Sequence, residues 1–111
     1  MKVQLKVDRK LRKALQNDEK KKLIQKAVKL NTSEMQRQSA RNVPVVTGNL
    51  KRSQQIHFED DGLKGIVGFT ADYAAYVELG TRFRAGQKYL GRAYNQQKDK
   101  FLEDIHKIVR A

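Results

Sequence analysis

The stretch that decides the fold class is residues 56–69, IHFEDDGLKGIVGF. Its two short apolar runs, residues 56–58 and 65–69, are typical of strands. The intervening DDG at residues 60–62 is typical of a turn, because aspartate and glycine tolerate a positive φ. The stretch therefore predicts an antiparallel hairpin, and its acidic pair is expected at the hairpin tip rather than in a catalytic dyad.

A long helix, residues 18–43, is predicted before this hairpin. Asn17 is its expected N-cap, and the acids Asp18 and Glu19 fall in the first turn, where the helix dipole favours negative charge. Pro44 ends the helix, because the residue before a proline avoids the α region. A length of about 37 Å is large for a small domain, so part of this helix is expected to lie against a neighbour. Its predicted apolar stripe is Leu23, Ile24, Ala27, Val28, Leu30, Met35 and Ala40.

Residues 1–17 leave two alternatives open. Alternation of polar and apolar residues from position 2 to position 7 predicts a half-buried strand. A helix is the alternative, and Asp8 is a candidate cap for a short helix over residues 9–16. The residues that this helix would turn inward are Leu11, Ala14 and Leu15.

A second long helix is predicted at the other end, over residues 88–110. Its apolar residues recur at intervals of three and four, and Lys107 and Arg110 fall in the last turn, where cations are favoured. Between the two helices, residues 44–86 are rich in glycine and predict a turn-rich β region. The chain is therefore expected to be a single α+β domain, with helices around a small antiparallel sheet. The predicted inward positions of the last helix are Leu90, Ala93, Tyr94, Gln97, Phe101, Leu102, Ile105, Ile108 and Val109.

The net charge of +12 is unevenly distributed. Residues 1–30 contain eleven Lys or Arg and three acids. This asymmetry predicts an acidic partner, either nucleic acid or a protein surface, while a solvated lysine-rich helix face is the alternative. The chain has no cysteine, and no apolar run approaches the roughly 18 residues of a membrane span. We expect a soluble protein made in the cytoplasm, with no membrane partner.

No motif in the sequence predicts a catalytic, cofactor or metal site. His57 and His106 lack ligands at metal-binding spacing. The serines lack a glycine elbow and a nearby histidine. We therefore expect neither an enzyme nor a small-molecule substrate.

A binding role has more support in the segment that follows the hairpin. There, aromatic residues interleave with cations, a mixture that suits either nucleic acid or a protein interface. Composition alone leaves both open. The aromatic residues are Tyr73, Tyr76, Phe83, Tyr89 and Tyr94, and the cations are Arg82, Arg84, Lys88 and Arg92.

Two strings in the middle of the chain carry a family resemblance. Residues 43–53 read VPVVTGNLKRS, and residues 71–82 read ADYAAYVELGTR. In this order they resemble the signature of the tail-completion, or head–tail joining, family of long-tailed bacteriophages of the lambdoid gene-ten-product type, A-P-V-D-T-G-x-L-R-x-S followed by Y-A-x-Y-V-E-F-G-T. The resemblance covers roughly residues 20–95. Val46 departs from it by replacing an aspartate, and residues 88–93, KYLGRA, replace the usual P-F-L-R-P-A.

The matching residues also have a physical interpretation. Gly48 permits a change of direction, and Thr47 is a candidate cap for a short helix over residues 49–54. We expect the tyrosines of the second string, with Val77 and Leu79, to supply apolar bulk. The motif residues expected to form the central turns of the fold are Pro44, Thr47, Gly48, Leu50, Tyr73, Tyr76, Gly80 and Thr81.

The resemblance implies a structural virion protein of the phage neck. Copies would form a ring around the DNA channel, with a hexamer favoured, and would contact other connector and tail proteins. The protein would be found in the virion and, during assembly, in the host cytoplasm. The alternative is a free basic nucleic-acid-binding protein. The residues expected to contact partners or DNA are Lys20, Lys21, Lys22, Lys26, Glu78, Arg82, Arg84 and Lys88.

Overall fold

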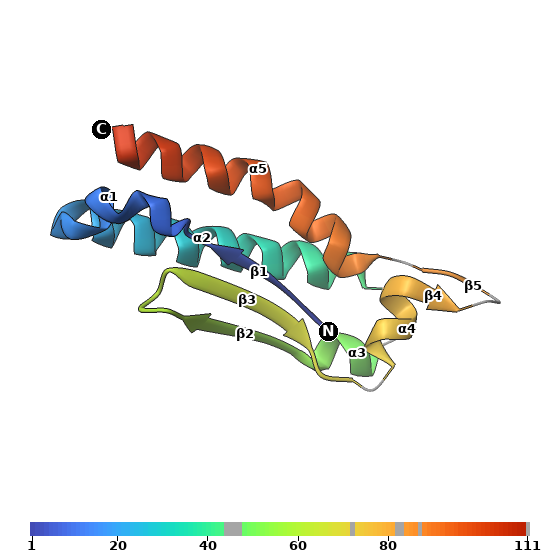
Figure 1. Cartoon of the computed structure of the whole chain (residues 1–111). Coiled ribbons are helices and arrows are strands. Elements are labelled where there is room, and N and C mark those ends of the chain that lie inside the picture. The colour runs from blue at the N-terminus through green and yellow to red at the C-terminus, as the bar shows by residue number, and fades with distance from the viewer. Residues whose placement is uncertain (44–47, 72, 82–83, 87, 111) are drawn as a thin grey trace.

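A computed structural model describes residues 1–43, 48–71, 73–81, 84–86 and 88–110 of the chain. A long helix from each half of the chain lies on one side of a small antiparallel sheet, which confirms the α+β prediction (Figure 1). The elements in chain order are β1 Lys2–Lys6, the 3₁₀ turn η1 Arg9–Leu11, α1 Arg12–Gln16, α2 Asp18–Asn42, α3 Gly48–Arg52, β2 Gln54–Glu59, β3 Lys64–Phe69, α4 Ala74–Leu79, β4 Gly80–Thr81, β5 Arg84–Ala85 and α5 Tyr89–Arg110.

The main sheet is built around the predicted hairpin. β3 is its central strand and pairs antiparallel with β2 on one side and β1 on the other. The turn between β2 and β3 has a positive φ at Asp60 (56°), Asp61 (56°) and Gly62 (79°), as the aspartate and glycine pattern predicts. The N-terminal segment contains both predicted structures, one after the other, because the strand β1 is followed by the short helix α1.

The caps of the first helices also follow from the sequence. Asn17 adopts an extended conformation, and its side chain accepts a hydrogen bond from the backbone nitrogen of Lys20 at 3.1 Å, which confirms it as the N-cap of α2. The carboxylate of Asp8 accepts one from the backbone nitrogen of Lys10 at 2.9 Å, at the start of η1. The bounds of α5 match the predicted C-terminal helix to within one residue.

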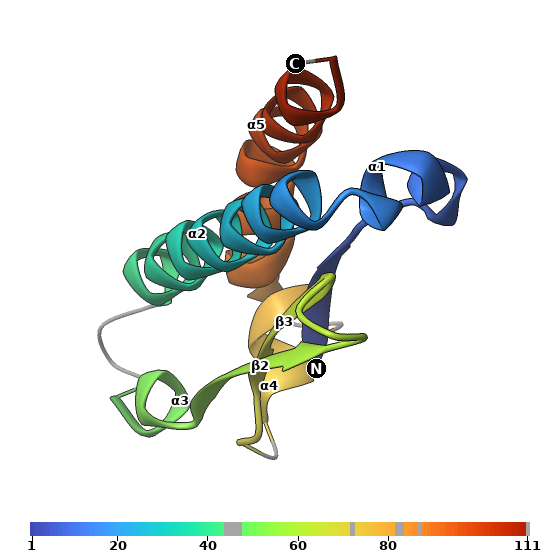
Figure 2. The same ribbon diagram turned by 90° about the vertical axis from the view of Figure 1, so that its left-hand side faces the viewer.

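The helices and the sheet form layers that run along the long axis of the molecule (Figure 1). α2 lies across one face of the sheet, and α5 packs along α2 and beside β1 (Figure 2). The molecule measures 50 × 20 × 19 Å, and its radius of gyration is 15.6 Å. A compact domain of this length has a radius of about 13 Å. Its accessible surface of 7551 Å² likewise exceeds the roughly 6,300 Å² typical of its mass. The chain therefore exposes more surface than a typical monomer of its size.

The core lies between α2, the sheet and α5. Ile24, Val28 and Met35 of α2 are fully buried, as predicted. Leu23 and Leu30 are instead 51% and 57% exposed, because they lie at the border of the α2 face that the sheet and α5 cover. Leu102 of α5, also predicted to face inward, is 51% exposed.

The approach of α2 to the sheet depends on Gly65. A Cβ atom at this position would lie 1.9 Å from the Oγ1 atom of Thr32, which is fully buried in α2. Such a separation is far inside van der Waals contact, so only glycine fits this site without a shift of the helix. The absence of a side chain at Gly65 allows α2 to lie directly on β3.

Candidate interaction surfaces

Glu78 joins α4 to the beginning of α5. Its side chain is buried, with 6% of the residue exposed. Its Oε2 atom accepts a hydrogen bond from the backbone nitrogen of Leu90 at 3.1 Å, and its Oε1 atom accepts one from that of Gly91 at 2.6 Å. The first N–H groups of a helix have no partner within the helix, and the helix dipole favours an anion there. Glu78 is therefore used within the fold, which removes it from the surface residues expected to contact partners.

Tyr89 makes a second connection between the same elements. Its hydroxyl donates a hydrogen bond to the carbonyl oxygen of Ala74 at 2.9 Å, and its ring packs edge-on against Phe69, with the ring centroids 4.9 Å apart. Burial, together with the nearby charge of Glu78, raises the pKa of Tyr89 to about 12. Gly86 lies against the backbone of α4, since a Cβ atom there would come within 2.4 Å of the Glu78 carbonyl oxygen. α4 is thus attached to the beginning of α5, whose Tyr89 packs in turn on β3.

The other side of α4 is exposed and largely apolar. Tyr73, just before the helix, is 37% exposed, while Tyr76 and Leu79 are 65% and 69% exposed. These residues are three apart in sequence, so they lie along one face of the helix. We call them the α4 patch. Of the residues expected to supply apolar bulk, Val77 packs against the core, but these three do not, because the inward face of α4 is formed by Ala74 and Glu78.

α4 itself is a helix in a region that the sequence predicted to be turn-rich and β-structured. Residues 74–79, AAYVEL, are mostly good helix formers, and Ala74 and Glu78 are spaced by four residues on its buried side. The following ribbon, β4 and β5, begins at Gly80, whose φ is 86°. Leu50 in α3, one of the motif residues expected to form the central turns of the fold, is fully buried.

Several motif and contact residues are described in part or not at all. Lys88 is exposed and has a φ of 50°. Gly48 is the first residue of α3. The backbones of Thr81 and Arg84 belong to β4 and β5, respectively. The predictions for Pro44, Thr47 and Arg82 lie outside the described residues.

Two of the four contact lysines predicted in α2 have partners within the chain. The ammonium of Lys20 donates to the carbonyl oxygen of Val109 at 3.1 Å, near the end of α5. Lys21 forms an ion pair with Asp61 at 2.6 Å, and the hydrogen bond and charge of Asp61 raise the pKa of Lys21. These contacts attach the start of α2 to α5 and to the hairpin tip. Lys20 and Lys21 therefore have structural roles, whatever else they contact.

The exposed side of α2 is strongly basic. The two remaining contact lysines lie there, and other cations continue their row along the helix. At 1.5 Å per residue, the row is about 28 Å long. We call it the α2 cationic face, and its exposed members are Lys22, Lys26, Lys29, Arg37 and Arg41.

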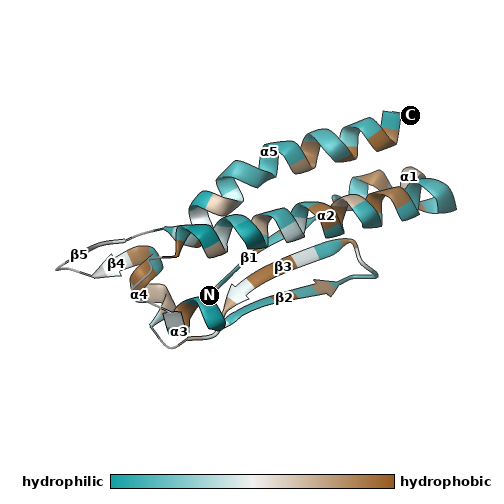
Figure 3. Ribbon diagram, turned by 180° about the vertical axis from the view of Figure 1, so that it is seen from behind, coloured by the Kyte–Doolittle hydropathy of each residue, from teal (hydrophilic) through white to brown (hydrophobic). Residues whose placement is uncertain are grey.

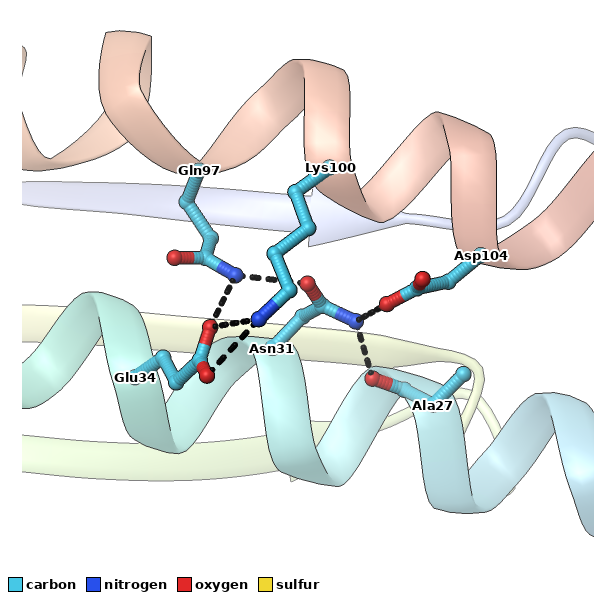
Figure 4. Close-up of polar contacts among 6 residues, drawn as sticks. All are labelled: Ala27, Asn31, Glu34, Gln97, Lys100 and Asp104. Carbon is cyan, nitrogen blue, oxygen red and sulfur yellow. Dashed lines mark hydrogen bonds and ion pairs between the residues drawn. The ribbon is translucent and has the colours of Figure 1, made fainter.

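A polar network connects α2 to α5 (Figure 4). The Nδ2 atom of Asn31, which is 2% exposed, donates to the carbonyl oxygen of Ala27 at 2.9 Å and to Asp104 at 3.0 Å. Gln97, 1% exposed, donates to Asn31 at 2.6 Å and to Glu34 at 2.8 Å. Buried polar groups are costly unless they are paired, so these bonds fix the register of the two helices.

Glu34 and Lys100 form the solvent-facing part of this network. The ammonium of Lys100 lies 2.8 Å from both carboxylate oxygens of Glu34. The hydrogen bonds from Lys100 and Gln97 lower the pKa of Glu34, and the hydrogen bond to Glu34 raises that of Lys100. The sequence did not predict this network, since Gln97 was assigned to the apolar, inward face of the last helix. Asn31, a polar residue in an otherwise apolar stripe, was the available signal.

A groove of about 300 Å³ lies beside the network, between α2 and the end of α5. Its apolar lining includes the exposed Leu23 and Leu30, and Ile108 of α5. Lys26 and Lys107 also line it. We call it the α2–α5 groove. The sequence did not predict it, because periodicity identified its leucines as core residues.

Neither a metal-holding group of side chains nor a membrane-spanning helix is found among the described residues. Within them, no three His, Cys, Asp or Glu side chains are grouped so as to hold a metal ion. No described helix has the length and apolar character needed to cross a membrane. What the described surface does offer is a fixed apolar patch, an apolar groove and a basic helix face.

Comparison with known proteins identifies one family. The family model HK97-gp10-like, described as "Bacteriophage HK97-gp10, putative tail-component", matches residues 6–80. This span covers well over half of the chain and ends where α4 gives way to the β4–β5 ribbon. No curated protein and no solved structure matches the chain.

Proposed function

Because the chain belongs to the HK97-gp10-like family of bacteriophage tail components, we propose that it is a structural protein of the phage neck that completes the tail and joins it to the DNA-filled head. In this proposal the protein acts by assembling with other virion proteins and catalyses no reaction. It would assemble in the host cytoplasm and remain in the virion. The two middle strings and the family match support this role together.

The observation that carries the proposal is the combination of an elongated shape with a fixed, exposed apolar patch. A small domain rarely exposes neighbouring large apolar side chains unless they meet a partner. The α4 patch is exposed although α4 is anchored by Glu78 and Tyr89. We propose that copies of the chain form a closed ring around the DNA channel, with six copies favoured, as closed symmetry is usual for homo-oligomers.

The α2 cationic face would meet DNA in the channel or an acidic surface of another connector or tail protein. The best residues to test are Lys22 and Lys29, because both are exposed and neither lines the α2–α5 groove, and because Lys20 and Lys21 already have partners in the chain. Replacing both with glutamate should reduce the yield of joined particles without unfolding the protein. A matched control is Lys2→Glu with Lys6→Glu, on the exposed side of β1.

The decisive experiment is deletion of the gene from its phage. Electron microscopy should then show filled heads and separate tails, and supply of the protein in trans should restore joined particles. Normal joined particles without the protein would refute the neck role. So would its absence from purified wild-type virions.

The second candidate is a free nucleic-acid-binding protein, which the α2 cationic face favours. About five cations along one helix face would give a steep loss of DNA affinity as salt rises. A gel-shift titration of the purified chain at physiological ionic strength tests it. Salt-sensitive binding by free protein that is missing from virions would favour this candidate over the neck role.

A further inference from the structure

Two unlike apolar surfaces lie on opposite halves of the molecule. The α4 patch lies at the end that carries the β4–β5 ribbon, and the α2–α5 groove lies toward the end that carries α1 (Figures 1 and 3). One is a helix surface that projects from the fold, and the other is hollow. Two different surfaces on one chain are what a head-to-tail contact between copies requires.

The α4 patch is suited to insertion because it is rigid and uncharged. α4 is held from behind by the bonds of Tyr89 and Glu78, so little conformational entropy is lost when its outer face is covered. Apart from the tyrosines, Glu78 is the only ionisable residue among residues 73–79, and its carboxylate is turned inward. On a chain of net charge +12, this face can approach a basic surface without like-charge repulsion.

The α2–α5 groove has the complementary properties. Its apolar lining includes Leu23, Leu30 and Ile108, and two lysines border it. Its one acid, Asp104, is already hydrogen-bonded to Asn31. A tyrosine ring that entered this groove would bury apolar surface and present its face to Lys26 or Lys107, which is a favourable cation–π arrangement.

We infer that the α4 patch of one copy docks in the α2–α5 groove of the next copy, an inference that rests on the ring assembly proposed above. The surface area agrees with this occupant. The chain exposes about 1,250 Å² more than a typical monomer of its mass. In a head-to-tail ring each copy takes part in two interfaces of about 800 Å² per partner, so it would bury about 1,600 Å², which is of the same order. A heterologous contact of this kind closes into a ring when its rotation allows. The competing occupant is an acidic amphipathic helix of another virion protein, attracted by Lys26 and Lys107.

The absence of cysteine from the chain makes a direct test possible. A variant with both Leu79→Cys and Leu30→Cys is incorporated into particles and treated with a short bismaleimide, which joins thiols that lie close together. We expect a ladder of linked multimers from the double variant, and at most traces of dimer from either single variant. The matched control pairs Leu79→Cys with Leu102→Cys, since Leu102 is as exposed as Leu30 but does not line the groove. It should give no ladder.

A mixing experiment separates a head-to-tail contact from a symmetric one. Leu79→Asp spoils the α4 patch, and Leu30→Asp spoils the groove, so neither variant alone should complete tails. When the two variants are supplied together, each retains the surface that the other lacks. Pairs should then form between the intact α4 patch of one variant and the intact groove of the other. Circular dichroism checks that each variant is folded, as expected for substitutions at exposed positions.

The outcomes distinguish this inference from the neck role. Particles that contain the double variant but yield no ladder would overturn the inference and leave the neck role intact. Efficient linkage by Leu79→Cys alone would replace it with a symmetric contact. Loss of joining by Leu30→Asp but not by Leu79→Asp would identify the acidic helix as the occupant of the groove. Absence of the wild-type protein from virions would refute the proposed function itself.

Discussion

The Oε1 atom of Glu78, near the end of α4, lies 2.6 Å from the backbone nitrogen of Gly91, in the first turn of α5. One carboxylate thereby caps a 22-residue helix from outside that helix. The contact also orients α4, so the exposure of its outer face is a consequence of the cap. Stability of α5 and presentation of the α4 patch therefore depend on the same side chain.

Replacement of Glu78 by alanine should destabilise the protein by roughly 2 kcal/mol, because hydrogen bonds to a charged group contribute about 1.5–3 kcal/mol. Urea unfolding followed by circular dichroism measures this free energy. The matched control is Glu103→Ala, which removes an exposed ion pair with Lys107 and should cost under about 0.5 kcal/mol. Equal effects of the two variants would show that the cap does not stabilise the fold.

Gly65→Ala should destabilise the protein by about 2 kcal/mol or more, since the added methyl group would overlap Thr32 and separate α2 from β3. Thermal unfolding measures the effect. The three atoms nearest to the new methyl group are Oγ1, Cγ2 and Cβ of Thr32, and Thr32→Ala removes the first two. The double variant should therefore lose less stability than the sum of the losses in the two single variants. Gly48→Ala is a matched control, because a Cβ there meets only the end of Arg52 at 3.5 Å. Strict additivity in the double variant would argue against the close approach.

The local features of the fold were predictable because their causes are local. Asn17 caps a helix that begins at the next residue, and the turn at residues 60–62 needs only its own φ values. The periodicity of α5 likewise lies within its own sequence. In each case the residues that determine the structure are within a few positions of one another.

The features that were missed depend on partners distant in the chain. Glu78 was predicted as a surface contact because its bonding partners, Leu90 and Gly91, are 12 and 13 residues away. Leu23 and Leu30 follow the helical period of the core, but the period does not say how wide a face of α2 the sheet and α5 cover. The groove lies at the border of that face, and the α4 patch is the side of α4 turned away from α5, so the candidate surfaces could be identified only from the arrangement of α2, α4 and α5.

The hydroxyl of Tyr89 should titrate at a higher pH than an ordinary tyrosine. Its pKa of about 12 lies above the ordinary value of 10.0, so the folded protein retains that proton to higher pH than the unfolded chain. Stability from this group is present below about pH 10 and is lost as the pH rises through the folded pKa. Ultraviolet absorbance should therefore show a tyrosine step near pH 12 that is absent from Tyr89→Phe. The variant should also lose less stability than wild type between pH 10 and pH 12. An unchanged late step in Tyr89→Phe would contradict the assignment.

Glu34 should make the helix pair sensitive to acid. Lys100 and Gln97 hold its folded pKa below the ordinary value of 4.5, so the unfolded chain takes up the proton first as the pH falls. The stability that Glu34 contributes is present above about pH 4.5 and is lost as the pH falls through the folded pKa. Glu34→Gln should therefore be less stable than wild type at pH 7, with a difference that shrinks below pH 4.5. Urea unfolding at a series of pH values measures it.

The Glu34 prediction has an internal control in Lys100→Gln, which removes the largest cause of the lowered pKa. In that background, Glu34→Gln should change stability by a smaller and less pH-dependent amount, because only the hydrogen bond from Gln97 and the charge of Arg37 remain to favour the carboxylate. The same pH dependence with and without Lys100 would mean that the ion pair across α2 and α5 does not determine the titration of Glu34.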